Sequence, residues 1–427
     1  MLMRSRPHFA TLLLALASTF ACGDDAAGVA DETGDTSTTG NGDGDGDGDG
    51  DGDGDGDGDP APSRDELIAE LEQPGPYAVG YKQLELTYSP PGATEPRTIP
   101  VLAWYPAVDD SGAPPAIYAV AGIVEIPSPA ALDQPPVSAL GPFPVAVYSH
   151  GSGGEALLAY PFAERFASHG WIMLSPAHVG NTALDALAGE SDSLIEIAVN
   201  RPADISAVLD EAGSGFAGDE LGGATDLSQV FLFGHSFGGY TTFAAGGAQL
   251  AYETLLAGCS GETCAYLEDP EVAAAFASGF GDDRVDAIAP QAPALIPELG
   301  EGELAALGIP TMLQSGKLDL TTPDATQAQP AWDGLANPDD VWIDLPFGAH
   351  YSFITVCDDL SPELLAVFQP DNMVDGCGPD FTPTSELVPV LTTYLLAFAR
   401  AHVLGELAWT AVFDGDALHP EVDLHRH

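Results

Sequence analysis

The stretch VFLFGHSFGGY, residues 230–240, joins an apolar run to a serine that is surrounded by glycines. The run at 230–233 is typical of a buried strand, and the small-residue segment that follows predicts a helix. A serine on such a strand-to-helix turn exposes its Oγ above the sheet edge, and the glycines let the turn close without clashes. The bare pattern G-x-S-x-G also arises by chance, so the rest of the chain decides what Ser236 does.

Strand-like and helix-like segments alternate along the chain from residue 77. An opening antiparallel pair is expected, and two insertions interrupt the alternation, at 106–142 and 249–283. Continuous apolar strands separated by helices predict an α/β fold with a mostly parallel central sheet and helices on both faces. The expected strands are 77–88, 97–107, 143–150, 171–177, 230–233, 284–293, 309–317 and 340–347, and the expected helices are 156–170, 201–212, 303–308 and 387–404.

The first sixty-odd residues are not expected to fold. Residues 1–21 combine two arginines with an apolar run too short to span a membrane, which is typical of a signal peptide. Cys22 follows directly, as in bacterial lipoproteins, where this thiol carries the lipid; cleavage after Ala21 with free secretion is the alternative. Residues 22–66, rich in alternating Gly and Asp, predict a disordered acidic spacer, because they cannot form a core and lack the varied ligand spacing of a calcium site. The folded domain is therefore expected at 67–427.

The chain is strongly acidic, with a formal net charge of −54. Residues 67–427 hold 49 of the 65 acidic residues and 8 of the 11 basic ones, so the charge is not confined to the spacer. An acidic surface repels nucleic acid and anionic lipid headgroups. We therefore exclude nucleic acid as a partner and expect membrane contact only through the N-terminal anchor.

Four cysteines lie in the predicted folded domain. An even number in an exported chain favours two disulfides. The spacing favours Cys259 with Cys264 and Cys357 with Cys377, although two other pairings remain open. Metal ligation is the weaker interpretation, because no histidine lies at ligand spacing from either pair.

Residues downstream of Ser236 supply candidates for its activation. A serine hydroxyl becomes a good nucleophile when a base removes its proton and an acid orients that base. In this architecture the chain order is serine, acid, histidine. His350 alone among the downstream histidines follows an expected strand, so it is the predicted base. Asp319 follows the preceding strand and is the predicted acid, with Asp324 in reserve.

Backbone amides near the serine are expected to stabilise a developing negative charge. The loop SHGSGG, residues 149–154, follows an expected strand and is small enough to approach a ligand closely. We predict that the N–H groups of Ser152 and Phe237 form this oxyanion hole. His150 is expected to brace the loop rather than to transfer protons. For His178, at the end of the next strand, substrate binding in the pocket wall and a plain loop role both remain open.

Five segments together resemble one group of known enzymes. SHGSGG, FASHGWIMLSPAHVGN, RPADISAVLD, FGHSFGGY and GAHYSF occur in the order seen in α/β hydrolases of the platelet-activating-factor acetylhydrolase and predicted dienelactone hydrolase group. The resemblance covers about residues 77–404 and implies the α/β-hydrolase fold. It also implies Ser236, Asp319 and His350 as nucleophile, acid and base, with backbone amides from Ser152 and Phe237. True dienelactone hydrolases use a cysteine nucleophile, so that label names a relative in fold.

The combined prediction is an exported, lipid-tethered serine esterase of the cell envelope. It would act on small or short-acyl carboxylic esters through an acyl-enzyme, with no metal or organic cofactor. A polyester hydrolase would use the same three residues in an open groove. A serine peptidase is disfavoured, because the chain has no large cap domain, and a non-catalytic binding protein is disfavoured, because every expected catalytic residue is present.

Overall fold

The computed structural model describes residues 62–427 except 121, 123, 362 and 364–374. The predicted signal peptide, the candidate lipid-bearing Cys22 and the Gly-Asp run all lie outside the described residues. No helix in the described part of the chain is long and apolar enough to span a membrane.

The described chain begins with a helix that starts inside the segment predicted as spacer. Helix α2 (Arg64–Glu72) begins before residue 67, where the folded domain was expected to start. Ser63 and Glu66 form a capping box at its N-terminus, which satisfies two backbone donors of the first turn. Its two leucines are buried against the rest of the fold, so the folded unit starts a few residues earlier than predicted.

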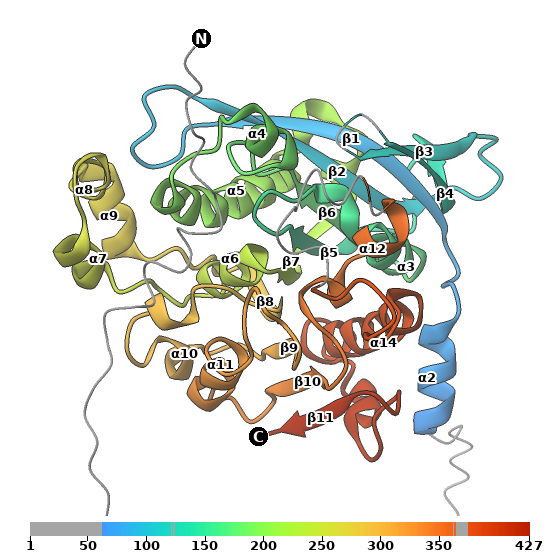
Figure 1. Cartoon of the computed structure of the whole chain (residues 1–427). Helices are drawn as coiled ribbons and strands as arrows, with labels where there is room; N and C mark the ends of the chain where they lie inside the picture. Colours follow the sequence, from blue (N-terminus) through green and yellow to red (C-terminus); the bar gives the residue numbers. More distant parts are fainter. Residues whose placement is uncertain (1–61, 121, 123, 362, 364–374) are drawn as a thin grey trace, which may run out of the picture. The chain divides into compact units, whose positions relative to one another are not determined.

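The strands of the described residues form one sheet of 11 strands, in the order β11-β10-β9-β8-β7-β5-β6-β2-β1-β4-β3 (Figure 1). The six neighbouring strands β6, β5, β7, β8, β9 and β10 pair in parallel. This confirms the mostly parallel sheet that the sequence predicts. After β5 the chain adds β6 on one side and β7 on the other, so a topological switch point lies between β5 and β7, where α/β proteins bind ligands. The strands are β1 (Ala78–Tyr88), β2 (Arg97–Ala107), β3 (Pro115–Val120), β4 (Val124–Asp133), β5 (Phe143–Ser149), β6 (Ile172–Pro176), β7 (Thr225–His235), β8 (Val285–Gln291), β9 (Met312–Gly316), β10 (Val341–Leu345) and β11 (Asp423–Arg426).

The first insertion extends the sheet. The predicted antiparallel pair is confirmed, because β1 and β2 pair along their whole length. The segment at 106–142 then forms the hairpin β3–β4, which joins the edge of the sheet through a parallel pairing of β4 with β1. Alternate residues of β3 are buried, which is the pattern of a strand with one face on a core.

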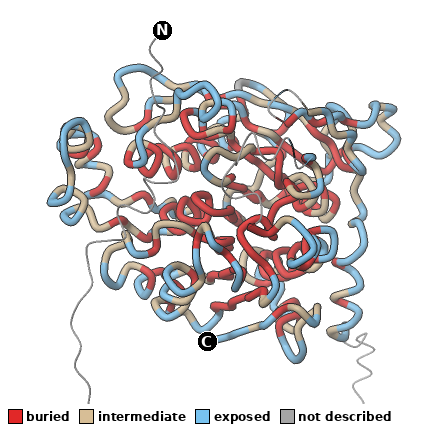
Figure 2. The backbone as a smooth tube through the Cα atoms, in the orientation of Figure 1, coloured by how far each residue is buried: buried red, intermediate tan, exposed pale blue. Residues whose placement is uncertain are grey.

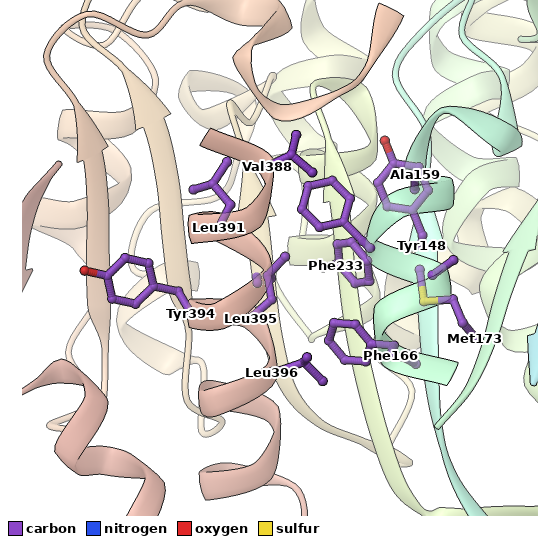
Figure 3. Close-up of a cluster of buried hydrophobic side chains, with 14 of the residues drawn as sticks. Tyr148, Ala159, Phe166, Met173, Phe233, Val388, Leu391, Tyr394, Leu395 and Leu396 are labelled. Atoms are coloured by element: carbon purple, nitrogen blue, oxygen red, sulfur yellow. The ribbon is translucent and has the colours of Figure 1, made fainter. Parts of the chain in front are cut away.

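Helices cover both faces of the sheet, as the continuous apolar strands predict. Alternate side chains of β7 point to opposite faces: Phe231 and Phe233 pack with α2, α3 and α14, whereas Val230 and Leu232 pack with α5, α6, α10 and α11. The buried core runs through the middle of this unit (Figure 2), and Figure 3 shows Phe233 facing leucines of α14. The helices after α2 are α3 (Tyr160–Ser168), α4 (Ala183–Ala188), α5 (Leu194–Ser214), α6 (Phe237–Ala245), α7 (Tyr252–Gly258), α8 (Glu262–Leu267), α9 (Pro270–Ser278), α10 (Glu303–Ala306), α11 (Ala328–Gly334), α12 (Val356–Asp359) and α14 (Thr384–His402).

The second insertion, at 249–283, forms the helices α7, α8 and α9 at one side of the unit (Figure 1). Their buried residues, among them Leu267, Val272 and Phe276, form a small core with Phe237 and Tyr240 of α6. This insertion therefore packs against the helix that follows Ser236.

The C-terminus adds a strand that the sequence did not predict. The last element expected from the sequence is the helix at 387–404, but residues 423–426 form β11, which pairs antiparallel with β10. The segment DLHR is polar and three of its four residues are exposed, so it carries no alternating apolar pattern. Backbone pairing with an open sheet edge is what orders it.

Candidate active site

Ser236 lies on a tight turn between β7, which ends at His235, and α6, which begins at Phe237. Its φ of 60° and ψ of −118° fall where residues other than glycine are rarely found, so the turn is strained. Gly238 permits the turn, because a Cβ at that position would lie 1.9 Å from the carbonyl oxygen of Ser149 on β5. The turn holds the Ser236 side chain at the carboxyl edge of the sheet, beside the switch point.

The structure brings Ser236, Asp319 and His350 together, although they lie on three separate loops. His350 Nε2 lies 2.9 Å from Ser236 Oγ, and His350 Nδ1 lies 2.9 Å from Asp319 Oδ2. The loops of Asp319 and His350 follow β9 and β10, as the sequence predicts. The three residues are 8%, 4% and 3% exposed, so bulk water has little access to these hydrogen bonds. In this arrangement the imidazole can take the serine proton while the carboxylate fixes its orientation.

The Asp319 carboxylate is held by its own loop. It accepts hydrogen bonds from the amides of Thr321 at 2.8 Å and Thr322 at 2.6 Å, and from the Thr322 hydroxyl at 2.7 Å. These donors fix the carboxylate in position for the remaining contact with His350. The geometry therefore favours Asp319 over the reserve candidate as the acid.

Asp324, the reserve, is engaged elsewhere. Its carboxylate accepts from Ser315 Oγ at 3.2 Å and pairs with Lys317 Nζ at 3.3 Å. Lys317 also pairs with the buried Asp344. Asp324 thus belongs to a neighbouring charged cluster at the ends of β9 and β10.

The amide of Phe237 has a fixed direction. In a trans peptide the N–H points opposite to the carbonyl of the preceding residue. The Ser236 carbonyl accepts from the amides of Gly239 at 2.8 Å, Tyr240 at 3.2 Å and Ala294 at 3.1 Å. Three donors on one side therefore direct the Phe237 N–H to the other, and within the described residues this amide has no protein acceptor.

The amide of Ser152 is fixed in the same way. The preceding carbonyl, that of Gly151, accepts from the Gly154 amide at 3.0 Å and from His150 Nδ1–H at 2.7 Å. The loop also lies directly against the serine turn, because a Cβ on Gly151 would lie 3.2 Å from Ser236 Cβ. No acceptor for the Ser152 amide is found in the described part of the chain. The two amides predicted to form an oxyanion hole are thus both oriented by their own peptide groups.

His150 and His178 are structural groups behind this loop. His150 braces the loop through Gly151, and its Nε2 accepts from the His178 amide at 3.0 Å. Of the two roles left open for His178, the geometry favours the loop role, because its side chain is fully buried between Ser149 Oγ at 2.9 Å and Asp204 Oδ2 at 2.8 Å. Burial and nearby arginines hold the pKa of both histidines well below the ordinary value, so both stay neutral.

Sequence reasoning missed two residues that hold the loop of His350. His235 Nε2–H donates to the His350 carbonyl at 2.7 Å, and burial keeps its pKa well below the ordinary range. Asp375, only 1% exposed, accepts from the amides of Leu320 at 3.0 Å and Thr321 at 2.9 Å and reaches the His350 amide at 3.5 Å. One carboxylate thus connects the loop of Asp319 to the loop of His350. In the sequence, the position of His235 beside Ser236 was the only indication that it has a role in the site. No sequence feature indicated a role for Asp375.

Both disulfides form as the spacing favoured. Cys259 pairs with Cys264 in the second insertion, and Cys357 pairs with Cys377 beside Asp375.

The described residues contain no group of three or more His, Cys, Asp or Glu side chains that could hold a metal ion.

Comparison with known proteins identifies the fold. No protein-family model matches the chain, and no curated protein matches it. The structure is similar to that of a ferulic acid esterase from Streptomyces cinnamoneus, with a TM-score of 0.57, 21% sequence identity, and coverage of 82% of this chain and 97% of that one. At this identity the likeness concerns the fold alone. Together with the strand order, it shows that the chain has an α/β fold of the α/β-hydrolase type, as the sequence predicts, whereas membership of the platelet-activating-factor acetylhydrolase group stays a prediction.

Proposed function

We propose that this protein is an exported serine hydrolase that cleaves small or short-acyl carboxylic esters. The observation that carries the proposal is the position of the His350 imidazole, within hydrogen-bond distance of both Ser236 Oγ and Asp319 Oδ2. Serine hydrolases on unrelated folds share this geometry. The esterase neighbour and the proposed kinship with platelet-activating-factor acetylhydrolases favour an ester over other acyl compounds.

The reaction has two halves. Ser236 Oγ attacks the ester carbonyl carbon as its proton passes to His350 Nε2, and Asp319 holds the Nδ1–H of the imidazolium. The carbonyl oxygen becomes an oxyanion that accepts from the amides of Ser152 and Phe237. The alcohol leaves with the proton from His350, and a water that His350 deprotonates then hydrolyses the acyl-enzyme.

Replacement of the nucleophile tests the proposal. Ser236→Ala removes the attacking oxygen and should lower kcat on p-nitrophenyl acetate by about 10⁴-fold or more, with an unchanged circular dichroism spectrum. Ser228→Ala, which changes a serine on the distant, exposed start of β7, is the matched control and should leave turnover unchanged. Near-normal turnover by Ser236→Ala would refute the assignment, as would failure of a fluorophosphonate probe to label the wild-type protein.

The acyl preference is a separate question. We propose short acyl groups, and a panel of p-nitrophenyl esters of increasing chain length, with a methyl ferulate arm suggested by the named neighbour, tests this. A maximum at acetyl or propionyl supports the proposal, and a maximum at long chains or at the feruloyl ester contradicts it.

A polyester is the second candidate substrate. The loops that carry Asp319 and His350 expose Leu320 (74%), Phe347 (53%) and Leu318 (40%), which is an apolar surface next to the site. Soluble products released from a polyester film by wild-type protein, and reduced by Leu320→Asp without loss of p-nitrophenyl acetate turnover, would favour this candidate.

We also propose that the protein is exported and tethered through a lipid on Cys22, with the Gly-Asp spacer holding the enzyme off the membrane. The two disulfides are typical of an oxidising compartment. Cys22→Ser should move the protein from the membrane fraction to the soluble fraction. Wild-type protein found only in the soluble fraction would favour free secretion instead.

A further inference from the structure

Arg201 is a buried cation behind the candidate site that has no carboxylate partner. Its side chain lies on α5 and is only 1% exposed. None of the ion pairs of the described residues involves it, because Asp204, one turn further along α5, pairs instead with Arg97 and His178. Burial lowers the pKa of Arg201 to about 9, so the guanidinium is still protonated at neutral pH. A buried charge without a carboxylate in direct contact is costly to a fold, which suggests that it has a function.

The contacts of this guanidinium reach the loop of the Ser152 amide by two routes. Its Nη2 donates to the His150 carbonyl and to Ser149 Oγ, at 3.2 Å to the latter, and its Nη1 donates to Asn181 Oδ1 at 2.9 Å. The Asn181 side chain in turn donates to Ser152 Oγ at 2.9 Å. The backbone carbonyl of Asn181 accepts from the amide of Gly153, the residue after Ser152, at 3.0 Å. The fork of Arg201 therefore holds the loop from both ends.

Arg201 also contacts the residue that supplies the second amide. Its guanidinium carbon lies 5.2 Å from the centre of the Phe237 ring, a cation–π distance. Pro202 strengthens the link between the two helices. A proline has no N–H for the carbonyl of Ala198 four residues earlier, and the Tyr240 hydroxyl of α6 donates to that carbonyl instead, at 2.9 Å. One side chain thus touches both halves of the candidate oxyanion hole.

We propose that Arg201 is a positioning residue of the oxyanion hole, which holds the Ser152 amide in direction and lends its buried positive charge to the oxyanion. This inference rests on the proposed function, because only a reaction through a tetrahedral intermediate creates that negative charge. In the resting protein the guanidinium is hydrogen-bonded to neutral groups and Asp204 acts on it from beyond ion-pair distance, whereas in the transition state the oxyanion adds a further negative charge. An interaction of this kind raises kcat rather than tightening substrate binding.

A pair of ketones separates this role from a structural one. An aryl trifluoromethyl ketone adds to the serine: the Oγ–C bond forms, the carbonyl π electrons move onto oxygen, and the Oγ proton passes to His350 Nε2. The matching aryl methyl ketone remains a neutral ketone. The first therefore requires the oxyanion hole and the second does not. The ratio of their dissociation constants measures how well the protein stabilises the oxyanion.

Arg201→Met, which keeps the chain length and removes the charge and the donors, is the main variant. We expect kcat on p-nitrophenyl acetate to fall by about 100-fold with KM within about threefold, which is the scale of losing an oxyanion-hole group. Trifluoromethyl ketone binding should weaken by the same factor while methyl ketone binding is kept. Arg201→Lys, which restores the charge without the fork, should recover part of both losses. Arg165→Met is the matched control. Arg165 lies on α3, and like Arg201 it donates to a backbone carbonyl, that of Leu71.

A folded Arg201→Met with kcat within threefold of wild type would overturn the inference, and so would equal weakening of both ketones. If that variant does not fold, Asn181→Leu cuts the route from Arg201 to Ser152 and should lower kcat and the ketone ratio together by about tenfold; an unchanged ratio would overturn the inference. Wild-type protein that binds the trifluoromethyl ketone no better than Ser236→Ala does would overturn the proposed function itself. A wild-type preference for that ketone that Arg201→Met retains would overturn only the role of Arg201.

Discussion

The two halves of the candidate site are held in place by different means. The half that carries Ser236 is fixed by backbone geometry: a strained turn, a glycine in contact with Ser149, and two peptide groups whose carbonyls have local donors. The half that carries Asp319 and His350 consists of loops after β9 and β10. These loops are joined by a backbone hydrogen bond from the Leu318 amide to the Gly348 carbonyl at 3.0 Å and by the Asp375 carboxylate, and His235 of β7 holds the His350 carbonyl.

The difference indicates how each half should respond to mutation. A side chain added at Gly238 in the serine half forces backbone atoms to move, so it should cost stability first. A change in the histidine half displaces one side chain on a loop, and such a displacement can lower the rate greatly while the fold survives. The four predictions below test this contrast, from the largest expected effect to the smallest.

Asp319→Asn should break the histidine half without unfolding the protein. An asparagine presents an amide that no longer selects the His350 tautomer with a free Nε2, and kcat on p-nitrophenyl acetate should fall by about 10⁴-fold. Asp324→Asn is the matched control on the same loop and should keep most of the activity. A larger loss in the control than in Asp319→Asn would move the acid role to Asp324.

Gly238→Ala should break the serine half through the backbone. The added Cβ would lie 1.9 Å from the Ser149 carbonyl oxygen, so β5 and α6 must separate, and the unfolding free energy should fall by about 3 kcal/mol or more. Gly223→Ala is the control, because a Cβ there meets nothing within 4 Å. Equal denaturant midpoints for the two variants would contradict a backbone-fixed turn.

The serine half could be predicted from the sequence because its determinants are local. The apolar strand, the glycines and the serine occupy eleven consecutive residues, and their spacing alone specifies the turn. The places of Asp319 and His350 followed from chain order, because each comes just after an apolar strand. Strands such as β9 and β10 are buried along their length and therefore stand out as apolar runs.

The rest depends on contacts that local patterns do not encode. Asp375 lies 25 residues from His350 and 55 from Leu320, and Arg201 lies 51 residues from the carbonyl that it contacts. The position of His178 after a strand indicated the site, but its ring turns into the interior toward Asp204. In all three cases the partner is set by the packing of elements distant in the chain.

Asp375→Ala tests the side-chain connection between the two loops and leaves the backbone hydrogen bond from Leu318 to Gly348 in place. Unfolding free energy should fall by about 2 kcal/mol, since several buried donors lose their acceptor, and kcat should fall about tenfold with little change in KM. Asp340→Ala is a close match: that buried carboxylate also accepts from backbone amides, those of Thr311 and Asn337, at the other end of β10. The control should lose stability and keep kcat, and an equal kcat in both variants would contradict a link through Asp375.

His235→Gln should change the pH dependence of stability more than the rate. The pKa of His235 is lowered in the folded protein, so between that pKa and about 6.5 the unfolded chain binds a proton that the folded protein does not. Unfolding free energy therefore falls as pH drops below about 6.5, by up to about 1.4 kcal/mol per pH unit from this residue. Glutamine keeps a donor for the His350 carbonyl and removes the titration, so the variant should lose less stability than wild type between pH 6.5 and 5 in urea unfolding. His425→Gln, an exposed histidine of β11, is the control. Parallel curves for wild type and His235→Gln would mean that His235 is not held neutral, and the histidine half would then have a charged imidazole beside His350.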